Sequence, residues 1–372
     1  MPTAVLVVGG SYAGVAAAQA IESQLSKAKV DFVITVVTEG DHFYHCIGGM
    51  RGAVEKGYGG KLFIPYDKLF KTPHGKVVHG RVATLHAKEA VLEDSTTIAF
   101  DYCVIATGST NAGGKGPSKS RAQGTTDIAR RADAMAAANS ILIVGGGPSA
   151  VELAGEIMTD LKGKTVTLVH SGPDLCPGVS AKFSAKVRAE LGKLGVQIIS
   201  NDRVERAAFG DDAIHEGTRT IVTSKGVSVT SDLQYFLAGN SKVNSECTES
   251  LGPDVLDSAK QVKTLPTLQL VGHPHIFAVG DVTDRPGGKL AYLAFAHGAI
   301  AGSNIRKLVA GDKGALQEFK PPGSPVMIVT IGRNDGAAQL PFGVFGSWVS
   351  STIKSKHLFL PKQYSTLNAT MP

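Results

Sequence analysis

Cysteine is scarce in this sequence, and its spacing excludes several kinds of site. The 372 residues include four cysteines, Cys46, Cys103, Cys176 and Cys247, and no two of them form a C-x-x-C pair. Such isolated cysteines provide neither a metal cluster nor a disulfide framework. We therefore predict no metal site, and a reducing compartment.

Long hydrophobic runs are also missing. No uninterrupted apolar stretch approaches the roughly 20 residues of a membrane-spanning helix. The first expected strand starts almost at Met1, which leaves no room for a signal peptide, and Pro2 stands where N-myristoylation requires glycine. The prediction is a cytoplasmic protein whose contact with a membrane, if it has one, is peripheral.

A strong charge of one sign is absent too. The formal net charge of +6 and the pI near 9.0 are modest for a chain of this length, so no nucleic-acid partner is expected. With 43% hydrophobic and 19% charged residues, the chain has enough apolar material for two or three folded cores.

What the sequence does contain is a strand, a glycine-rich turn and a helix at its beginning. The strand is expected at residues 4–8 and an alanine-rich helix at residues 15–25. The turn between them consists of Gly9, Gly10, Ser11, Tyr12, Ala13 and Gly14. This arrangement points backbone N–H groups and the positive end of the helix dipole at a pyrophosphate. Because Ser11 replaces the middle glycine of the dinucleotide motif, an ordinary capping loop is the alternative.

Polar residues follow the second expected strand, at residues 32–37. Glu39 stands where a Rossmann unit has the acid for the adenosine ribose, and an exposed turn acid is the alternative. Further on, His45 and Arg51 are candidates to face the cofactor. The alternative for them is a solvated turn with a pyrophosphate-pairing or surface arginine.

The strand expected at residues 100–106 ends in a turn of small residues. Ala106, Thr107 and Gly108 allow the backbone to pass close to a ligand, which in this context is a flavin diphosphate or ribose. The following residues 111–124 are rich in Gly, Ser, Lys and Pro and predict a flexible connection between domains.

A second nucleotide motif begins at residue 140. A buried strand at residues 140–144 leads into a G-x-G-x-x-A turn and a helix, and a further strand follows at residues 165–169. The turn includes Gly145, Gly147, Pro148 and Ser149. This complete βαβ context predicts a dinucleotide site. Glu152 and Glu156 share one face of the helix, either near a nicotinamide or as ordinary first-turn acids. Since His170 follows the next strand in place of an acid or an arginine, NADH versus NADPH stays open.

A late apolar strand ends in Gly280 and Asp281. We expect it to return to the first sheet, with Asp281 at the carboxyl end, where α/β sheets bind ligands. In two-dinucleotide flavoproteins such an aspartate binds the ribityl chain of the flavin. Lys289, Ala291 and Tyr292 should open the next helix, with its N-terminal amides facing the flavin.

The predicted fold class is therefore α/β, with two Rossmann-like dinucleotide-binding domains and a small C-terminal α+β domain. The FAD-binding domain is discontinuous, at residues 1–112 and 241–318. The NAD(P)H-binding domain is inserted at residues 113–240, and the C-terminal domain comprises residues 319–372.

The chain resembles the apoptosis-inducing factor family of flavin-dependent oxidoreductases, and in particular its ferroptosis-suppressor-like branch. The resemblance runs nearly end to end and includes G-G-S-Y-A-G, D-H-F-Y-H, G-G-M-R, L-F-I-P-Y, V-I-A-T-G-S-T, V-G-G-G-P-S-A-V-E-L-A-G-E-I, A-V-G-D, K-L-A-Y-L-A-F-A-H and I-G-R-N-D-G. Departures are Ser11, Ala238 in place of a family Thr-Gly, and the missing myristoylation signal.

The resemblance implies an FAD-dependent NAD(P)H:quinone oxidoreductase that reduces ubiquinone-like or vitamin K-like quinones. Its flavin contacts fall on residues 9–13, Arg51, Val82, Thr107 and Asp281, and its nicotinamide-side acid on Glu152. His45 and Lys354 match residues around the isoalloxazine ring and the substrate. Without the resemblance, Lys354 is better interpreted as a solvated surface lysine. The sequence does not decide whether the flavin is modified.

The tail after Asp335 has lysines and aromatic residues but no acid. Such a segment fits docking at a membrane interface, packing over the flavin or self-association as a homodimer. Two functional alternatives also stay open. One is a single-cysteine NADH oxidase or peroxidase using Cys46, and the other is a redox-sensitive flavoprotein that acts as a binding factor.

Overall fold

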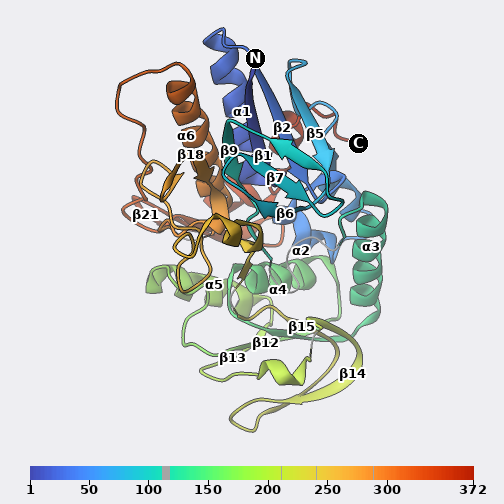
Figure 1. The fold of residues 1–372 in the computed structure, drawn as a ribbon. Coiled ribbons are helices and arrows are strands. Elements are labelled where there is room, and N and C mark those ends of the chain that lie inside the picture. Colours follow the sequence, from blue (N-terminus) through green and yellow to red (C-terminus); the bar gives the residue numbers. More distant parts are fainter. Residues whose placement is uncertain (111–117, 211, 240, 288) are drawn as a thin grey trace.

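The computed structural model describes residues 1–110, 118–210, 212–239, 241–287 and 289–372. Figure 1 shows two lobes, each built on its own sheet, with the C-terminus back beside the N-terminal lobe. Both sheets are mainly parallel and have helices packed on them, so the predicted α/β class with two Rossmann-like units is correct.

The N-terminal lobe contains a six-stranded sheet in the order β17-β18-β9-β1-β2-β5. Its strands are β1 (Thr3–Val8), β2 (Phe32–Thr38), β5 (Gly75–His79), β9 (Tyr102–Ile105), β17 (Gln269–Leu270) and β18 (His273–Ala278). β18 pairs in parallel with β9, so the late strand does return to the first sheet.

Two helices cover one face of this sheet, α1 (Tyr12–Lys27) and α6 (Ala291–Val309). They pack closely because α6 has glycine at the contact: a Cβ on Gly298 would lie 2.7 Å from the nitrogen of Ala17. The other face meets a three-stranded sheet of β6 (Val82–Leu85), β7 (Glu89–Leu92) and β8 (Thr97–Ala99). The site at the strand ends thus rests on a core buried on both faces.

The second lobe has a five-stranded sheet in the order β13-β12-β11-β15-β14. Its strands are β11 (Ser140–Val144), β12 (Thr165–His170), β13 (Gln197–Ser200), β14 (Ile214–Val222) and β15 (Ser228–Phe236). Its helices are α3 (Arg121–Ala137), α4 (Pro148–Asp160) and α5 (Ala181–Lys193). Only β14 runs antiparallel to its neighbour.

Helix α3 corrects part of the predicted linker. Residues 111–117 lie outside the described residues, but residues 121–124 form the first turn of α3, and Ser120 caps that helix by accepting a hydrogen bond from the Gln123 N–H. Gly124 is buried against Phe63, since a Cβ there would lie 2.5 Å from the ring. This glycine therefore reflects close packing and not chain flexibility.

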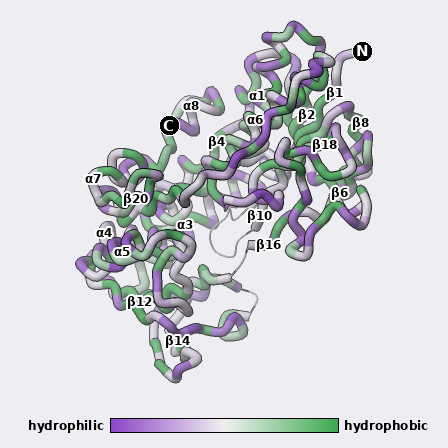
Figure 2. Tube along the Cα trace, turned by 90° about the vertical axis from the view of Figure 1, so that its left-hand side faces the viewer, coloured by the Kyte–Doolittle hydropathy of each residue, from purple (hydrophilic) through white to green (hydrophobic). Residues whose placement is uncertain are grey.

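Residues 327–372 form a small α+β unit that touches both lobes. Its elements are β19 (Met327–Ile331), β20 (Asp335–Leu340), β21 (Gly343–Phe345), α7 (Ser347–Ser350), the π-helix η6 (Ser351–Ser355) and α8 (Leu360–Thr366). Figure 2 shows β20 and α7 next to α4 and α5. α8 is tied to the first lobe, where Tyr364 Oη donates to Lys61 O (3.0 Å) and Gln19 Nε2 donates to Thr366 O (2.6 Å).

Shorter elements complete the connections. They are β3 (His42–Tyr44), β4 (Phe63–Pro65), β10 (Ser109–Thr110), β16 (Lys242–Val243), α2 (Gly49–Gly52) and the 3₁₀ turns η1 (Cys46–Gly48), η2 (Gly59–Leu62), η3 (Arg206–Ala208), η4 (Glu246–Leu251) and η5 (Gly280–Val282). The β10–β16 pair joins the segments on either side of the second lobe. The domain boundaries near residues 112 and 240 fall at undescribed residues and stay a prediction. Among the described helices, none is long and apolar enough to cross a membrane.

Candidate active site

The first glycine turn has the geometry of a phosphate-binding loop. Gly9 has φ +110°, and a Cβ there would lie 2.3 Å from Ala106 O; a Cβ on Gly14 would lie 1.8 Å from Gly9 O. Ser11 is the N-cap of α1, but its side chain makes no capping hydrogen bond. The first amides of α1 therefore lack a side-chain cap, as expected where an anion binds.

Tyr66 supports this turn and was not predicted as a site residue. The Tyr66 side chain is buried, and its hydroxyl donates to Gly10 O at 2.6 Å. A Cβ on Gly10 would lie 2.6 Å from the hydroxyl oxygen of Tyr66. The only signal in the sequence is its place in L-F-I-P-Y. A tyrosine at that position gives no local sign that it packs under a turn 56 residues away.

The carboxyl ends of β9 and β18 bring further predicted residues to the same edge. Thr107 Oγ1 is buried and has no hydrogen-bond partner among the described residues, although Asn244 Nδ2 donates to Thr107 O. Asp281 accepts a 2.7 Å hydrogen bond from Ser109 Oγ, and Gly280 has φ +74°. A buried hydroxyl without a protein partner, beside a glycine turn and a helix N-terminus, fits a bound FAD.

Two predicted flavin contacts lie at the margin of this edge. Glu39 is half-buried and forms ion pairs with Arg81 (3.4 Å) and Lys119 (2.5 Å). Val82 is buried in β6 beneath the sheet. Their contacts with a cofactor stay predictions.

A cavity of about 220 Å³ lies between Asp281 and the start of α6. Lys289 lines it, α6 begins at Ala291, and the Tyr292 side chain is exposed. His297, which was not predicted, also lines the cavity. Its Nδ1 accepts from the Gly280 N–H (3.2 Å), its Nε2 is buried without a partner among the described residues, and burial lowers its pKa to about 4.

The second glycine turn has open space beside it. Gly145 has φ +127°, whereas a Cβ on Gly147 would meet no described atom within 4 Å. Gly147 is the N-cap of α4, Pro148 follows as the first helical residue and Ser149 is exposed. This free approach to the helix N-terminus fits the pyrophosphate of a second dinucleotide.

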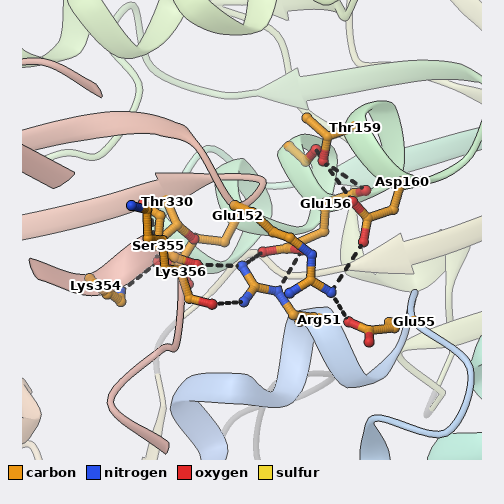
Figure 3. A network of polar contacts seen from close by, with 12 residues as sticks. Arg51, Glu55, Glu152, Glu156, Thr159, Asp160, Thr330, Lys354, Ser355 and Lys356 are labelled. Carbon is orange, nitrogen blue, oxygen red and sulfur yellow. Dashed lines mark hydrogen bonds and ion pairs between the residues drawn. The ribbon is translucent and has the colours of Figure 1, made fainter. Parts of the chain in front are cut away.

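Helix α4 has three acids at four-residue spacing, and each faces a cation from elsewhere in the chain (Figure 3). Such spacing places side chains on one face of the helix. The three pairs are Glu152 with Lys354 (2.6 Å), Glu156 with Arg51 (2.7 Å) and Asp160 with Arg333 (4.0 Å), and Arg333 also contacts Glu55. The interpretation of Glu152 and Glu156 as ordinary first-turn acids is therefore wrong.

Arg51 lies at the centre of this network. Its side chain is fully buried, with Nε 2.9 Å from Glu156 Oε2, and it donates to the carbonyls of Ser355 (2.7 Å) and Lys356 (3.2 Å). Burial acts to lower the pKa of Arg51, but the hydrogen bonds and charge of Glu156 outweigh it and raise that pKa. The structure thus shows Arg51 holding the tail; contact with the flavin stays a prediction.

His45 holds the same tail segment from the other side. Its Nε2 lies 2.7 Å from Leu358 O, which can only accept, so Nε2 carries the proton and Nδ1 accepts from Tyr12 Oη at 3.1 Å. Burial lowers the pKa of His45 to about 4, and the nearby Lys354 acts in the same direction. His45 is therefore a neutral side chain that fixes the tail.

The tail backbone has an uncommon conformation next to the carbonyls that Arg51 and His45 bind. Leu358 and Phe359 have φ of +48° and +59°, in the left-handed region that bulky side chains avoid. They follow the π-helix that contains Lys354. Lys354 Nζ contacts Glu152 (2.6 Å) and Ile328 O (2.9 Å), and its side chain is 14% exposed. The interpretation of Lys354 as a solvated surface lysine is therefore wrong.

All four cysteines lie among the described residues, and none of them forms a disulfide bond. Cys46 is half-buried, with Sγ 3.9 Å from Tyr12 Oη. Cys103, Cys176 and Cys247 are buried, and burial raises the pKa of each thiol. Among the described residues, no group of three His, Cys, Asp or Glu side chains is placed to hold a metal ion.

Two Rossmann-like sheets, each with a glycine turn, and a shared polar junction define an oxidoreductase that binds FAD and NADH or NADPH. The model of the pyridine nucleotide-disulphide oxidoreductase family matches residues 3–298. The chain belongs to this family and, within it, to the group of apoptosis-inducing factor and ferroptosis suppressor proteins.

Its relatives match over almost their whole length. Apoptosis-inducing factor homolog B of Dictyostelium discoideum is 35% identical, covering 99% of this chain and 97% of that protein. Human ferroptosis suppressor protein 1 is 31% identical, with 99% and 96% covered. The structure of the sulfide:quinone oxidoreductase from Aquifex aeolicus has a TM-score of 0.76 at 18% identity, with 99% and 92% covered, which shows a shared fold.

Proposed function

We propose that the protein is an FAD-dependent NAD(P)H:quinone oxidoreductase. The observation that carries this proposal is the ion pair of Lys354 and Glu152, where the tail meets α4. When bound, the nicotinamide nucleotide supplies a hydride and the flavin accepts it and passes the electrons on. The protein's part is to place charge and exclude water around that exchange.

Lys354 supplies a fixed cation in this place. Two of its three N–H groups are accounted for by Glu152 and Ile328 O, which leaves one donor for a quinone oxygen. Since the side chain is mostly withdrawn from solvent, its charge is less screened than at the surface. A preorganised cation of this kind stabilises the negative charge that develops as a quinone is reduced.

Glu152 and His45 act through Lys354 in this proposal. Glu152 pairs with the ammonium group and also accepts from the Thr330 N–H at 3.3 Å. His45 holds Leu358 O, four residues beyond Lys354. Together they fix both the charge and the backbone that present Lys354.

The test is anaerobic mixing of the FAD-loaded protein with NADH or NADPH, followed by a quinone, with the flavin absorbance recorded throughout. Reduction by the nucleotide and rapid reoxidation by ubiquinone-like or vitamin K-like quinones is the expected course. Reoxidation by peroxide or oxygen but not by quinone would overturn the proposal.

A second candidate function uses Cys46. The observation that favours it is the half-buried thiol beside the hydroxyl of Tyr12, at the start of the helix that fits the FAD pyrophosphate. A Cys46→Ser variant with undiminished quinone turnover would exclude an NADH oxidase or peroxidase of this type. A flavoprotein that acts only as a binding factor would not consume the nucleotide over many turnovers.

The tail also supports a proposal about location. Phe342 and Trp348 are 78% and 82% exposed and lie in a segment without acids after Asp335. We propose that this surface brings a cytoplasmic protein to an anionic membrane, where lipid-soluble quinones reside. Association of two copies through the same aromatic surface is the alternative.

A further inference from the structure

The two Rossmann units differ in the residues that follow their second strands. In both units the first glycine N–H donates to the second strand, from Gly9 to Val37 O and from Gly145 to Val169 O. The next two positions are Thr38 and Glu39 in the first unit. By the same register they are His170 and Ser171 in the second unit, so neither of these two positions has a carboxylate. These positions face the adenosine ribose in a Rossmann unit.

The imidazole of His170 has a defined orientation and proton position. Its Nε2 lies 3.0 Å from the carbonyl oxygen of Asp174, which can only accept, so Nε2 carries the proton and Nδ1 has the lone pair. The ring lies against the glycine turn, because a Cβ on Gly146 would be 2.3 Å from Cγ and 2.7 Å from Nδ1. His170 therefore packs directly against the loop that fits the pyrophosphate.

The charged groups around His170 leave it neutral near pH 7. Burial lowers its pKa, and Arg188 acts in the same direction, while Asp174 opposes the shift. Arg188 Nη2 donates to Pro173 O and Ser200 Oγ, each at 2.7 Å, and so fixes the loop that contains Asp174. The nearby Asp202 carboxylate is occupied by Thr223 Oγ1 and backbone N–H groups.

We propose that His170 contacts the 2′ position of the adenosine ribose and decides between NADH and NADPH. The inference rests on nucleotide binding and not on the quinone. A neutral imidazole accepts a hydrogen bond from the 2′-hydroxyl of NADH through Nδ1. A protonated imidazole donates from Nδ1 to the 2′-phosphate of NADPH, and no carboxylate at this place repels that phosphate.

The test compares two probes that differ only at the 2′ position, 5′-AMP and adenosine 2′,5′-bisphosphate. Both are titrated calorimetrically into the FAD-loaded protein at pH 7.5. Relative to 5′-AMP, the bisphosphate should bind about tenfold more weakly to His170→Asp and about tenfold more tightly to His170→Arg. Ratios within about twofold of the wild-type ratio in both variants would overturn the proposal.

A neutral variant isolates the effect of protonation. The 2′-phosphate itself titrates near pH 6, so the wild type is compared with His170→Gln at each pH. The affinity for the bisphosphate relative to 5′-AMP should be higher in the wild type than in His170→Gln, and this difference should grow as the pH falls from 8 to 6. A constant difference would contradict a contact between the imidazole and the 2′ group.

Two further variants control for position and charge. His215 lies on β14, far from β12 in the sheet order, and its imidazole binds Phe209 O at 2.9 Å. His215→Gln should therefore leave the affinity for both probes unchanged. Arg188→Gln removes a cation that lowers the pKa of His170, so the pH dependence should remain and should begin at a higher pH. Anaerobic flavin reduction by NADH and NADPH gives the same comparison without quinone, so it remains informative if quinone reduction fails.

Discussion

Arg51 and Glu156 form a buried, two-point ion pair. Nε and Nη2 of Arg51 lie 2.9 and 2.7 Å from the two carboxylate oxygens, and the side chains are 0% and 1% exposed. They come from different lobes, and Arg51 also binds two carbonyls of the tail. This pair therefore connects all three parts of the molecule.

Removing one partner of this pair should destabilise the protein strongly. In Glu156→Ala the guanidinium is left buried without its counter-ion, which typically costs about 3–5 kcal/mol. The measurement is urea unfolding followed by flavin and tryptophan fluorescence. Asp133→Ala, which removes the surface pair with Lys56 (3.1 Å), is the control and should cost less than about 1 kcal/mol. Equal effects of the two variants would show that the Arg51 pair does not hold the junction.

Replacing the tail lysine should slow the second half of the reaction. We expect Lys354→Met to reduce the rate of flavin reoxidation by quinone about 10²-fold or more, because the fixed cation is lost. Stopped-flow absorbance separates this step from flavin reduction. Lys356→Met removes an exposed lysine two residues away and should change neither rate. A Lys354→Met variant that reoxidises at the wild-type rate would refute the role of this cation.

Acid should destabilise the fold through its buried histidines. The pKa values of His45 and His297 fall from 6.5 in the unfolded chain to about 4 in the folded protein. Between these values the unfolded chain binds more protons, so stability is complete above pH 6.5 and falls as the pH drops toward 4, by up to about 3 kcal/mol per histidine.

Unfolding midpoints measured from pH 7 to 4 provide the check. His45→Gln retains a donor for Leu358 O but does not titrate, so its pH profile should be flatter than that of the wild type. Parallel profiles would mean that His45 does not contribute to the acid sensitivity.

A methyl group at the second glycine turn should separate binding from folding. Gly147→Ala adds a Cβ that meets no described atom, so the melting temperature should stay near the wild-type value while NADH affinity falls, because the methyl group enters the space that fits the pyrophosphate. Gly192→Ala on α5, also with nothing within 4 Å, should leave affinity unchanged. Wild-type NADH affinity in Gly147→Ala would place the nucleotide elsewhere.

The aromatic tail should be required for membrane binding. Co-sedimentation with anionic liposomes at low salt is expected for the wild type and should fall in Trp348→Ser combined with Phe342→Ser, since both side chains are largely exposed. Val222→Ser, at another exposed apolar side chain in the second lobe, is the control. A wild-type protein that stays in the supernatant would reject membrane docking.

The sequence predicts local features of this fold well and distant contacts poorly. Both glycine turns are recognisable because strand, turn and helix are continuous in the chain, and the same is true of the strand ending in Asp281. The tail carbonyls that His45 and Arg51 bind are more than 300 residues away in the sequence, and no local pattern encodes these contacts. α3 was missed because its polar sequence with Gly124 resembles a linker until Phe63 packs against it.

The position of Lys354 shows the same limit. A lysine in a lysine-rich tail has no feature in the sequence that predicts burial, and the resemblance alone indicated a role. The structure supplies the reason, because a π-helix turns its side chain toward α4. Whether Glu39, Val82 and Tyr292 contact a cofactor stays a prediction.

The hydrogen bonds of Arg51 and His45 to the tail affect the order in which the chain can fold during synthesis on the ribosome. Arg51 emerges about a hundred residues before Glu156, and the carbonyls that complete its shell come some two hundred residues later still. Domains tend to fold in the order in which they leave the ribosome. Here Arg51 and Glu156 can pair once both lobes have been translated, but the carbonyls of Ser355 and Lys356 that complete the surroundings of Arg51 arrive only with the tail.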